Sequence, residues 1–125
     1  MNIVGLGDAG CNIAATFAQY PQYKIYKINL DIEGERCYNI IKCETAEEYE
    51  NVSLPKIKPF FKGMKGDTLF IVGGSGKISC ASLRILENIK KLPVSILYIE
   101  PDMDVLTGPQ LLQERVVSAV LQEYT

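Results

Sequence analysis

Histidine and tryptophan are both absent from this chain of 125 residues. Without histidine, neither a Ser-His-Asp nor a Cys-His catalytic relay can form, and zinc sites that use histidine ligands are excluded. Without tryptophan, the chain lacks the best platform for stacking a base or a cation. The cysteines form no C-x-x-C pair, so we expect reduced thiols that pack as small hydrophobic residues in a cytoplasmic protein. They are Cys11, Cys37, Cys43 and Cys80.

The sequence also lacks long apolar runs and a strong excess of either charge. No run approaches the roughly 20 apolar residues that a membrane-spanning helix needs, and the first residues include no basic region typical of a signal peptide. The 13 Lys and Arg residues against 15 Asp and Glu residues give a net charge of −2. This near balance predicts no binding to nucleic acid and no broad contact with an anionic membrane.

What the chain does contain is an alternation of short apolar runs and helical periodicity, with Gly, Pro or Asp at each change. The 47% hydrophobic content is enough for the core of one domain, which we expect over residues 1–125. The last residues lie inside an amphipathic pattern with no capping glycine. Either a helix simply ends there or the chain is a fragment of a longer protein.

Four segments have the composition of strands and four have the periodicity of helices. Residues 38–42 fit either a short strand or a helical turn, whereas 44–51, with four glutamates, and 100–108 are expected to be loops. This order is typical of βαβ units, so we predict an α/β fold: a three-layer, Rossmann-like, mostly parallel sheet of four or five strands with helices on both faces. The expected strands are 2–6, 24–30, 68–72 and 94–99, and the expected helices are 9–20, 57–64, 78–89 and one beginning at Pro109.

Three segments follow strands of this sheet, at the edge where parallel sheets bind ligands. Gly5-Leu6-Gly7-Asp8-Ala9-Gly10 leads into a helix whose free N–H groups favour phosphate, or it is a tight turn that binds nothing. Asn29-Leu30-Asp31-Ile32-Glu33-Gly34 offers carboxylates to a ribose or to Mg²⁺, or is a solvated turn. Gly73-Gly74-Ser75-Gly76-Lys77 is a second phosphate loop or a flexible connection. Two such glycine loops side by side predict a polyphosphate held between two helix N-termini.

One interpretation is a Rossmann module that binds NAD. The first loop fits the dinucleotide fingerprint G-x-G-x-x-G, and Asp31 follows about 20 residues later, where an acid that binds ribose belongs. Against this interpretation, no substrate domain follows in the sequence. The fingerprint also explains neither Asn12 nor the second glycine cluster.

A second interpretation depends on the order of the motifs. Val4-Gly5-Leu6-Gly7-Asp8-Ala9-Gly10-Cys11-Asn12 resembles the first nucleotide loop of the tubulin/FtsZ family of GTPases. Leu30-Asp31-Ile32-Glu33-Gly34 is similar to the V-D-L-E-P of tubulins, and Asn29-Leu30-Asp31 to the N-T-D of FtsZ. The segment 67–76 resembles the strand that leads into the family's G-G-T-G-[ST]-G signature, and 94–108 resembles the next strand and loop. The resemblance covers most of the chain in the right order.

This resemblance implies a guanine-nucleotide-binding domain with GTP or GDP and Mg²⁺ as ligands. Asp31 and Glu33 would lie near Mg²⁺, and Thr107 would lie near the ribose. The residues implied to cradle the phosphates are Gly7, Asp8, Ala9, Gly10, Cys11, Asn12, Gly73, Gly74, Ser75 and Gly76.

The chain departs from the family at several points. Asp8 places a negative charge where FtsZ has glycine, and Ile78 replaces the last glycine of the second signature. No segment matches the family's catalytic acidic loop, so the resemblance implies a domain that is incomplete for GTP hydrolysis on its own. Self-association into filaments is the family expectation. The alternative within the family is a degenerate protein that binds no nucleotide and acts as a structural or regulatory partner.

Overall fold

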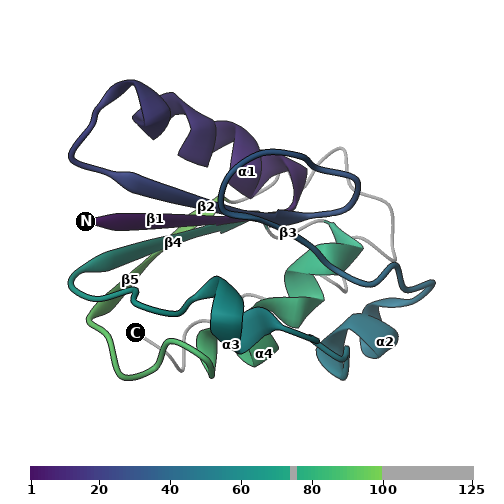
Figure 1. Ribbon diagram of the computed structural model, residues 1–125. Coiled ribbons are helices and arrows are strands. Elements are labelled where there is room, and N and C mark those ends of the chain that lie inside the picture. Colours follow the sequence, from purple (N-terminus) through teal and green to yellow (C-terminus); the bar gives the residue numbers. More distant parts are fainter. Residues whose placement is uncertain (74–75, 100–125) are drawn as a thin grey trace.

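The computed structural model describes residues 1–73 and 76–99, and a parallel sheet forms its centre (Figure 1). In this part of the chain the strand order is β3-β2-β1-β4-β5, and every neighbouring pair is parallel. The predicted parallel sheet is therefore confirmed, and the segment around 38–42 supplies a short edge strand. The strands are β1 (Asn2–Leu6), β2 (Lys24–Asn29), β3 (Cys37–Asn39), β4 (Thr68–Gly73) and β5 (Val94–Ile99).

The central strands β1 and β4 are apolar along most of their length because both of their faces are covered. Every residue of β1 is buried. Successive side chains alternate between the two faces of the sheet. Ile3 and Ile71 pack beneath α1 (Gly7–Thr16), whereas Val4 and Phe70 point into the larger core on the opposite face.

Helices cover both faces of the sheet, so the expected three-layer arrangement is confirmed. In Figure 1, α1 lies above the sheet, and the three shorter helices lie below it. The lower helices are α2 (Ala46–Glu50), α3 (Ile57–Phe60) and α4 (Ser82–Leu86), and a 3₁₀ helix at Lys77–Ala81 leads directly into α4. No helix in the described ranges is long and apolar enough to cross a membrane.

Helix α2 forms within 44–51, so the prediction of an exposed acidic loop there was wrong. The hydroxyl of Thr45 caps the helix by accepting a hydrogen bond from the amide of Glu48 at 3.2 Å. The carboxylate of Glu48 accepts a hydrogen bond from the amide of Glu44 at 3.1 Å. The ring of Tyr49 enters the core and is only 3% exposed. The spacing of Thr45 and Glu48 is the capping-box signal that identifies this helix in the sequence.

The other helices are shorter than their periodicity predicts. The helix expected over 9–20 begins at Gly7, and a 3₁₀ turn at Phe17–Gln19 follows it. The helix expected over 57–64 is a single turn that begins after Lys56, whose φ of 62° is left-handed. The loop expected at 100–108 and the helix expected from Pro109 lie outside the described residues.

Candidate functional site

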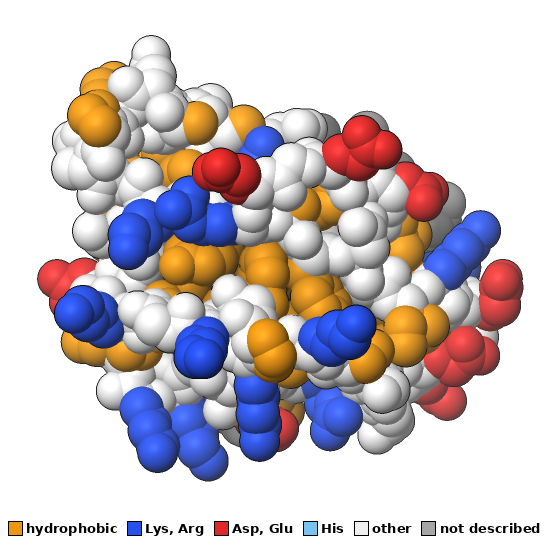
Figure 2. Space-filling view, viewed as in Figure 1, with side chains coloured by type: hydrophobic (Ala, Val, Ile, Leu, Met, Phe, Trp, Pro, Cys, Tyr) orange, Lys and Arg blue, Asp and Glu red, His pale blue; other side chains and the backbone are white. Residues whose placement is uncertain are grey.

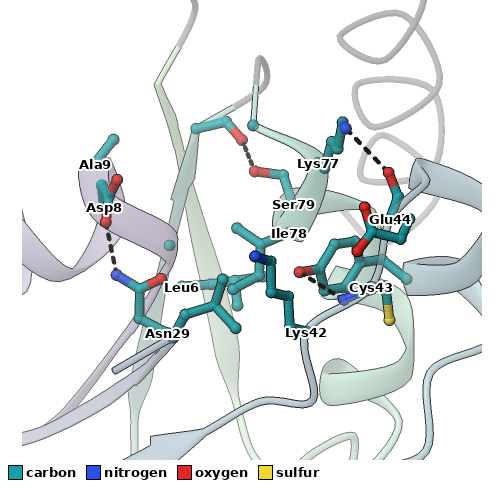
Figure 3. A pocket seen from close by; sticks show the side chains of 15 residues that line it. Leu6, Asp8, Ala9, Asn29, Lys42, Cys43, Glu44, Lys77, Ile78 and Ser79 are labelled. Atoms are coloured by element: carbon teal, nitrogen blue, oxygen red, sulfur yellow. Dashed lines mark hydrogen bonds between the residues drawn. The ribbon is translucent and has the colours of Figure 1, made fainter. Parts of the chain in front are cut away.

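A recess of about 670 Å³ opens at the carboxyl ends of the strands, beside β1, β2 and β4 (Figure 3). Strands β2 and β4 flank β1 on opposite sides, so the strand order reverses at this point. Open parallel sheets bind ligands at such a point. Three segments form the walls: the turn from β1 into α1, the turn after β4, and the segment between β3 and α2.

The first wall is the start of α1. Gly7 has a φ of +74°, a left-handed conformation that glycine adopts without strain, and it turns the chain directly from strand into helix. Leu6 occupies the N-cap position and contributes no side-chain cap. The first amide groups of a helix have no intrahelical acceptors, and the helix dipole makes this end positive. The wall therefore offers N–H donors that suit an anion.

Asp8 adds a carboxylate to this wall. The side-chain amide of Asn29, at the end of β2, donates a hydrogen bond of 2.8 Å to Oδ1 of Asp8 (Figure 3). The negative charge is favourable at the N-terminus of α1. It also repels a phosphate placed there, unless a cation lies between the two groups.

The second wall is the turn that follows β4. The hydroxyl of Ser79 donates a hydrogen bond to the carbonyl of Gly73, which closes this turn (Figure 3). The 3₁₀ helix begins at Lys77, again with no side-chain cap. A Cβ placed on Gly73 would lie 3.4 Å from the Cβ of Ala9 in α1. The two glycine-rich turns therefore lie side by side.

Ile78 fills part of the space between these two turns. Its Cγ2 lies 2.9 Å from the position that a Cβ would take on Gly7. The half-buried side chain also lines the recess. A ligand would therefore lie over the outer surface of both turns, because the isoleucine occupies the space directly between their main chains.

The third wall comes from residues 42–49, and our sequence analysis missed it because it treated most of this stretch as an exposed loop. The ammonium group of Lys77 donates a hydrogen bond of 3.0 Å to the carbonyl of Glu44, which ties the second wall to the third. The amide of Cys43 donates to the hydroxyl of Tyr49 at 3.2 Å. In Figure 3 the side chain of Lys42 extends into the recess. The capping box of α2 is the sequence signal that could have identified this wall.

Burial, assisted by the nearby Glu48 and Glu44 carboxylates, raises the pKa of the Cys43 thiol. The thiol is therefore neutral at physiological pH, where it is a poor nucleophile. Chemistry in this recess rests instead on amide donors, two lysines and two carboxylates. The lysines are Lys42 and Lys77, and the carboxylates belong to Asp8 and Glu44.

Five of the residues implied by the resemblance line the recess, and three others of the first motif or its helix do not. Gly10 is buried against β4, where a Cβ would lie 2.3 Å from the carbonyl oxygen of Ile71. Cys11 is buried, and its thiol donates to the carbonyl of Gly5 at 3.4 Å. Asn12 is exposed on α1 outside the recess. The five lining residues are Gly7, Asp8, Ala9, Gly73 and Gly76.

The expected metal ligands also lie outside the recess. Asp31 and Glu33 are exposed in the loop between β2 and β3. Asn39 holds that loop by accepting from the amide of Ile32 at 2.8 Å and donating to its carbonyl at 3.0 Å. Within residues 1–73 and 76–99, no three His, Cys, Asp or Glu side chains gather where they could hold a metal ion. The expected Gly74, Ser75 and Thr107 contacts fall on residues outside the described ranges.

Comparison of the chain with protein-family models and with curated proteins gave no match in either case.

Proposed function

We propose that this recess binds the phosphates of a nucleotide, and that the nucleotide is GTP or GDP, as the resemblance to the tubulin/FtsZ family implies. One observation carries the proposal. Two helix starts without side-chain caps and two lysines converge on a single recess at the point where the strand order reverses. Amide donors at helix starts, together with ammonium groups, are suited to phosphate oxygens.

The contacts indicate how the phosphates would lie. One phosphate would accept from the first amides of α1, above Gly7, and another from the start of the 3₁₀ helix at Lys77. Ile78 keeps the ligand outside the space between the turns. Lys42 and Lys77 are exposed, and both line the recess, so their ammonium groups would reach the outer phosphates.

Asp8 is the carboxylate best placed to hold the Mg²⁺ that accompanies a triphosphate. Mg²⁺ in nucleotide sites commonly binds one or two carboxylates together with phosphate oxygens, and it neutralises their charge. Asp8 lines the recess with its carboxylate fixed by Asn29. Asp31 and Glu33 do not fit this role because both lie outside the recess.

The lining supports binding better than hydrolysis. The chain contains no histidine, and the raised pKa of the Cys43 thiol keeps it neutral. The remaining acid-base candidates on the described lining are Asp8, assigned above to Mg²⁺, and Glu44. We therefore propose a nucleotide-binding domain that needs further residues for turnover. Assembly into filaments is a further proposal that rests on the resemblance alone.

NAD is the second candidate ligand, and the structure contains an observation that favours it. Gly10, the third glycine of G-x-G-x-x-G, packs α1 closely against β4, which is its role in dinucleotide-binding folds. The strand order β3-β2-β1-β4-β5 also matches those folds. Against NAD, Asp31, the residue expected to bind ribose, lies outside the recess.

Calorimetric titration with GTP, ATP and NAD, each with and without Mg²⁺, tests the proposal. We expect binding of GTP in preference to ATP and NAD. The variant Lys77→Ala should weaken GTP binding about ten-fold, the loss of one charge-assisted contact. Lys24→Ala, at the opposite end of β2, is the matched control and should leave binding unchanged.

Asp8→Asn sharpens the same experiment. Without Mg²⁺ the variant should bind GTP more tightly than the wild type, because a repelling charge is gone. With Mg²⁺ it should bind more weakly, because the metal loses its carboxylate. Preferential NAD binding would replace the guanine-nucleotide proposal, and no binding of any nucleotide would favour the degenerate alternative.

A further inference from the structure

Although the net charge of the chain is near zero, basic side chains are concentrated on one surface, around α3 and the C-terminal end of α4. Figure 2 shows Lys and Arg side chains gathered along the lower part of the molecule, where Figure 1 places these helices. In the two sequence stretches that form this surface, 52–67 and 84–92, the acidic residues are Asp67 and Glu87. The basic surface consists of Lys56, Lys58, Lys62, Lys65, Arg84, Lys90 and Lys91, all of them exposed.

None of these seven side chains has an ion-pair partner in the described part of the chain. The ion pair found there joins Arg36 to Glu35, at 3.9 Å, and it lies elsewhere. Like charges held close together repel each other and destabilise the folded state. A surface that concentrates uncompensated cations is therefore matched to an anionic partner, which would remove this repulsion on binding.

Two recesses run through the basic surface and meet. One, of about 770 Å³, includes Leu54, Pro59 and Arg84 in its lining. The other, of about 430 Å³, includes Met64 and Leu92. Lys58, Glu87, Asn88 and Lys90 line both recesses, so the two adjoin, and we call them together the groove.

The groove combines apolar lining residues, exposed cations and the exposed carboxylate of Glu87, and part of its wall is fixed. Arg84 donates from Nε and Nη2 to the carbonyl of Val52, at 3.2 and 3.1 Å, so its guanidinium group is held in place. The side-chain amide of Asn88 donates to the carbonyl of Arg84 at 2.9 Å. A preformed wall lowers the entropy lost when a ligand binds.

The lining distinguishes between classes of anionic partner. Single-stranded nucleic acid is held by stacking on exposed aromatic rings. The aromatic residues here are Phe61, which is buried, and Phe60, which is half-buried and packs edge-on against Tyr26. Membrane insertion needs exposed apolar side chains, and the exposed large ones in the described ranges do not line either recess. An acidic peptide with apolar side chains suits both the cations and the recesses.

We propose that this groove, with Lys58 and Lys90 in the lining of both recesses, binds an extended acidic segment of a partner protein that carries apolar residues between its carboxylates. The apolar side chains enter the two recesses, and the carboxylates pair with the lysines. The groove lies at the amino ends of β4 and β5, since 61–67 leads into β4 and 87–93 leads into β5. The nucleotide recess lies at the carboxyl ends, so the two sites are separate.

Fluorescence anisotropy with the whole chain tests this proposal. The probe is a labelled peptide of about twelve residues that alternates Glu and Leu, and the comparison peptide replaces every Leu with Gly. We expect the Glu-Leu peptide to bind about ten-fold more tightly than the Glu-Gly peptide, and its affinity to fall as salt is added. Equal binding of the two peptides would remove the role of the apolar recesses and overturn the proposal.

Charge reversal in the groove supplies the matched variants. Lys58→Glu with Lys90→Glu should weaken binding of the Glu-Leu peptide at least about ten-fold. Lys24→Glu with Lys27→Glu, which makes the same change in charge on β2, should leave it within about two-fold. If circular dichroism shows that the groove double variant is unfolded, Lys90→Glu alone is compared with Lys24→Glu. Unchanged binding by the folded groove variant would contradict the proposal.

Two further probes test the competing partners. A single-stranded oligonucleotide and vesicles that contain phosphatidylserine are titrated under the same conditions. We expect both to bind more weakly than the Glu-Leu peptide. Tighter binding of the oligonucleotide would identify a nucleic-acid surface, tighter binding of the vesicles would identify a membrane surface, and either result would overturn the proposal.

Discussion

Gly10 lies where α1 packs directly against the sheet. A Cβ on Gly10 would lie 2.3 Å from the carbonyl oxygen of Ile71, and a Cβ on Gly5 would lie 2.5 Å from the carbonyl oxygen of Gly10. Both oxygens belong to the main chain and cannot rotate away. These two glycines therefore set the distance between helix and sheet. The same bare backbone that suggests a phosphate loop in the sequence acts here through packing.

Alanine substitutions separate the glycines by role. Gly10→Ala should lower the free energy of unfolding by about 1–3 kcal/mol, because the new methyl group forces α1 away from β4. Gly76→Ala should change it by less than about 1 kcal/mol, because Gly76 has a φ of −84° and a Cβ there would meet nothing closer than 3.9 Å. Urea unfolding measures both values. Equal stability of Gly10→Ala and the wild type would contradict the packing role.

The sequence correctly predicted which turns meet at the edge of the sheet. It was a poorer guide to the role of each residue in those turns. The glycines of both loops were identifiable because they follow apolar strands. For Gly10 and Cys11, the sequence motif alone could not distinguish a phosphate-binding residue from a buried packing residue, since either can occupy the same position of the motif. Asp31 shows the same limit, because the course of its loop depends on Asn39.

Helix α2 contributes Tyr49 to the third wall of the recess, and its N-terminus depends on Thr45. Thr45→Ala removes the acceptor for the amide of Glu48 and should cost about 1 kcal/mol. The matched control is Thr16→Ala in α1, where the exposed hydroxyl donates to the carbonyl of Ile13 at 2.6 Å and no N-cap is lost. We expect that control to stay within about 0.5 kcal/mol of the wild type. Thermal unfolding of both variants makes the comparison, and equal losses would show that the cap contributes nothing.

Among the elements, the strands were predicted closely and the helices less well. Continuous apolar runs such as 68–72 and 94–99 are readily identified as buried strands in a chain where strand and helix patterns alternate. The short helices contain too few turns to show a clear apolar periodicity. Tertiary contacts stabilise them more than helix propensity does, so the local sequence indicates them only weakly. Helix α2 contains only five residues, and its single buried aromatic, Tyr49, was hidden among glutamates. Its capping box was the stronger signal.

The two buried thiols lie in the two layers of the core, on opposite faces of the sheet. Cys11 lies in α1 on one face of the sheet, and Cys80 lies in the 3₁₀ helix on the other. Burial raises the pKa of each thiol from 9.0 to about 11. Between these two pH values the unfolded chain loses thiol protons that the folded chain keeps. The free energy of unfolding should therefore fall as pH rises from 9.0 to about 11.

Urea unfolding at a series of pH values measures this dependence. Lysine and tyrosine side chains also titrate in this range, so the double variant Cys11→Ala with Cys80→Ala is the control. Its stability should start lower at neutral pH, because two buried side chains are shortened, and should fall less steeply above pH 9. Parallel curves for the two proteins would show that burial does not hold these thiols in their neutral form.

The sheet as a whole has its first strand at its centre. Strand β1 pairs with β2 on one side, but its partner on the other side, β4, begins only at Thr68. While the chain emerges from the ribosome, β1 therefore has one unsatisfied row of N–H and C=O groups along a mostly apolar strand. The innermost strand of the finished protein is thus an open edge during synthesis. A nascent chain that stalls before β4 presents that edge to aggregation or to a chaperone.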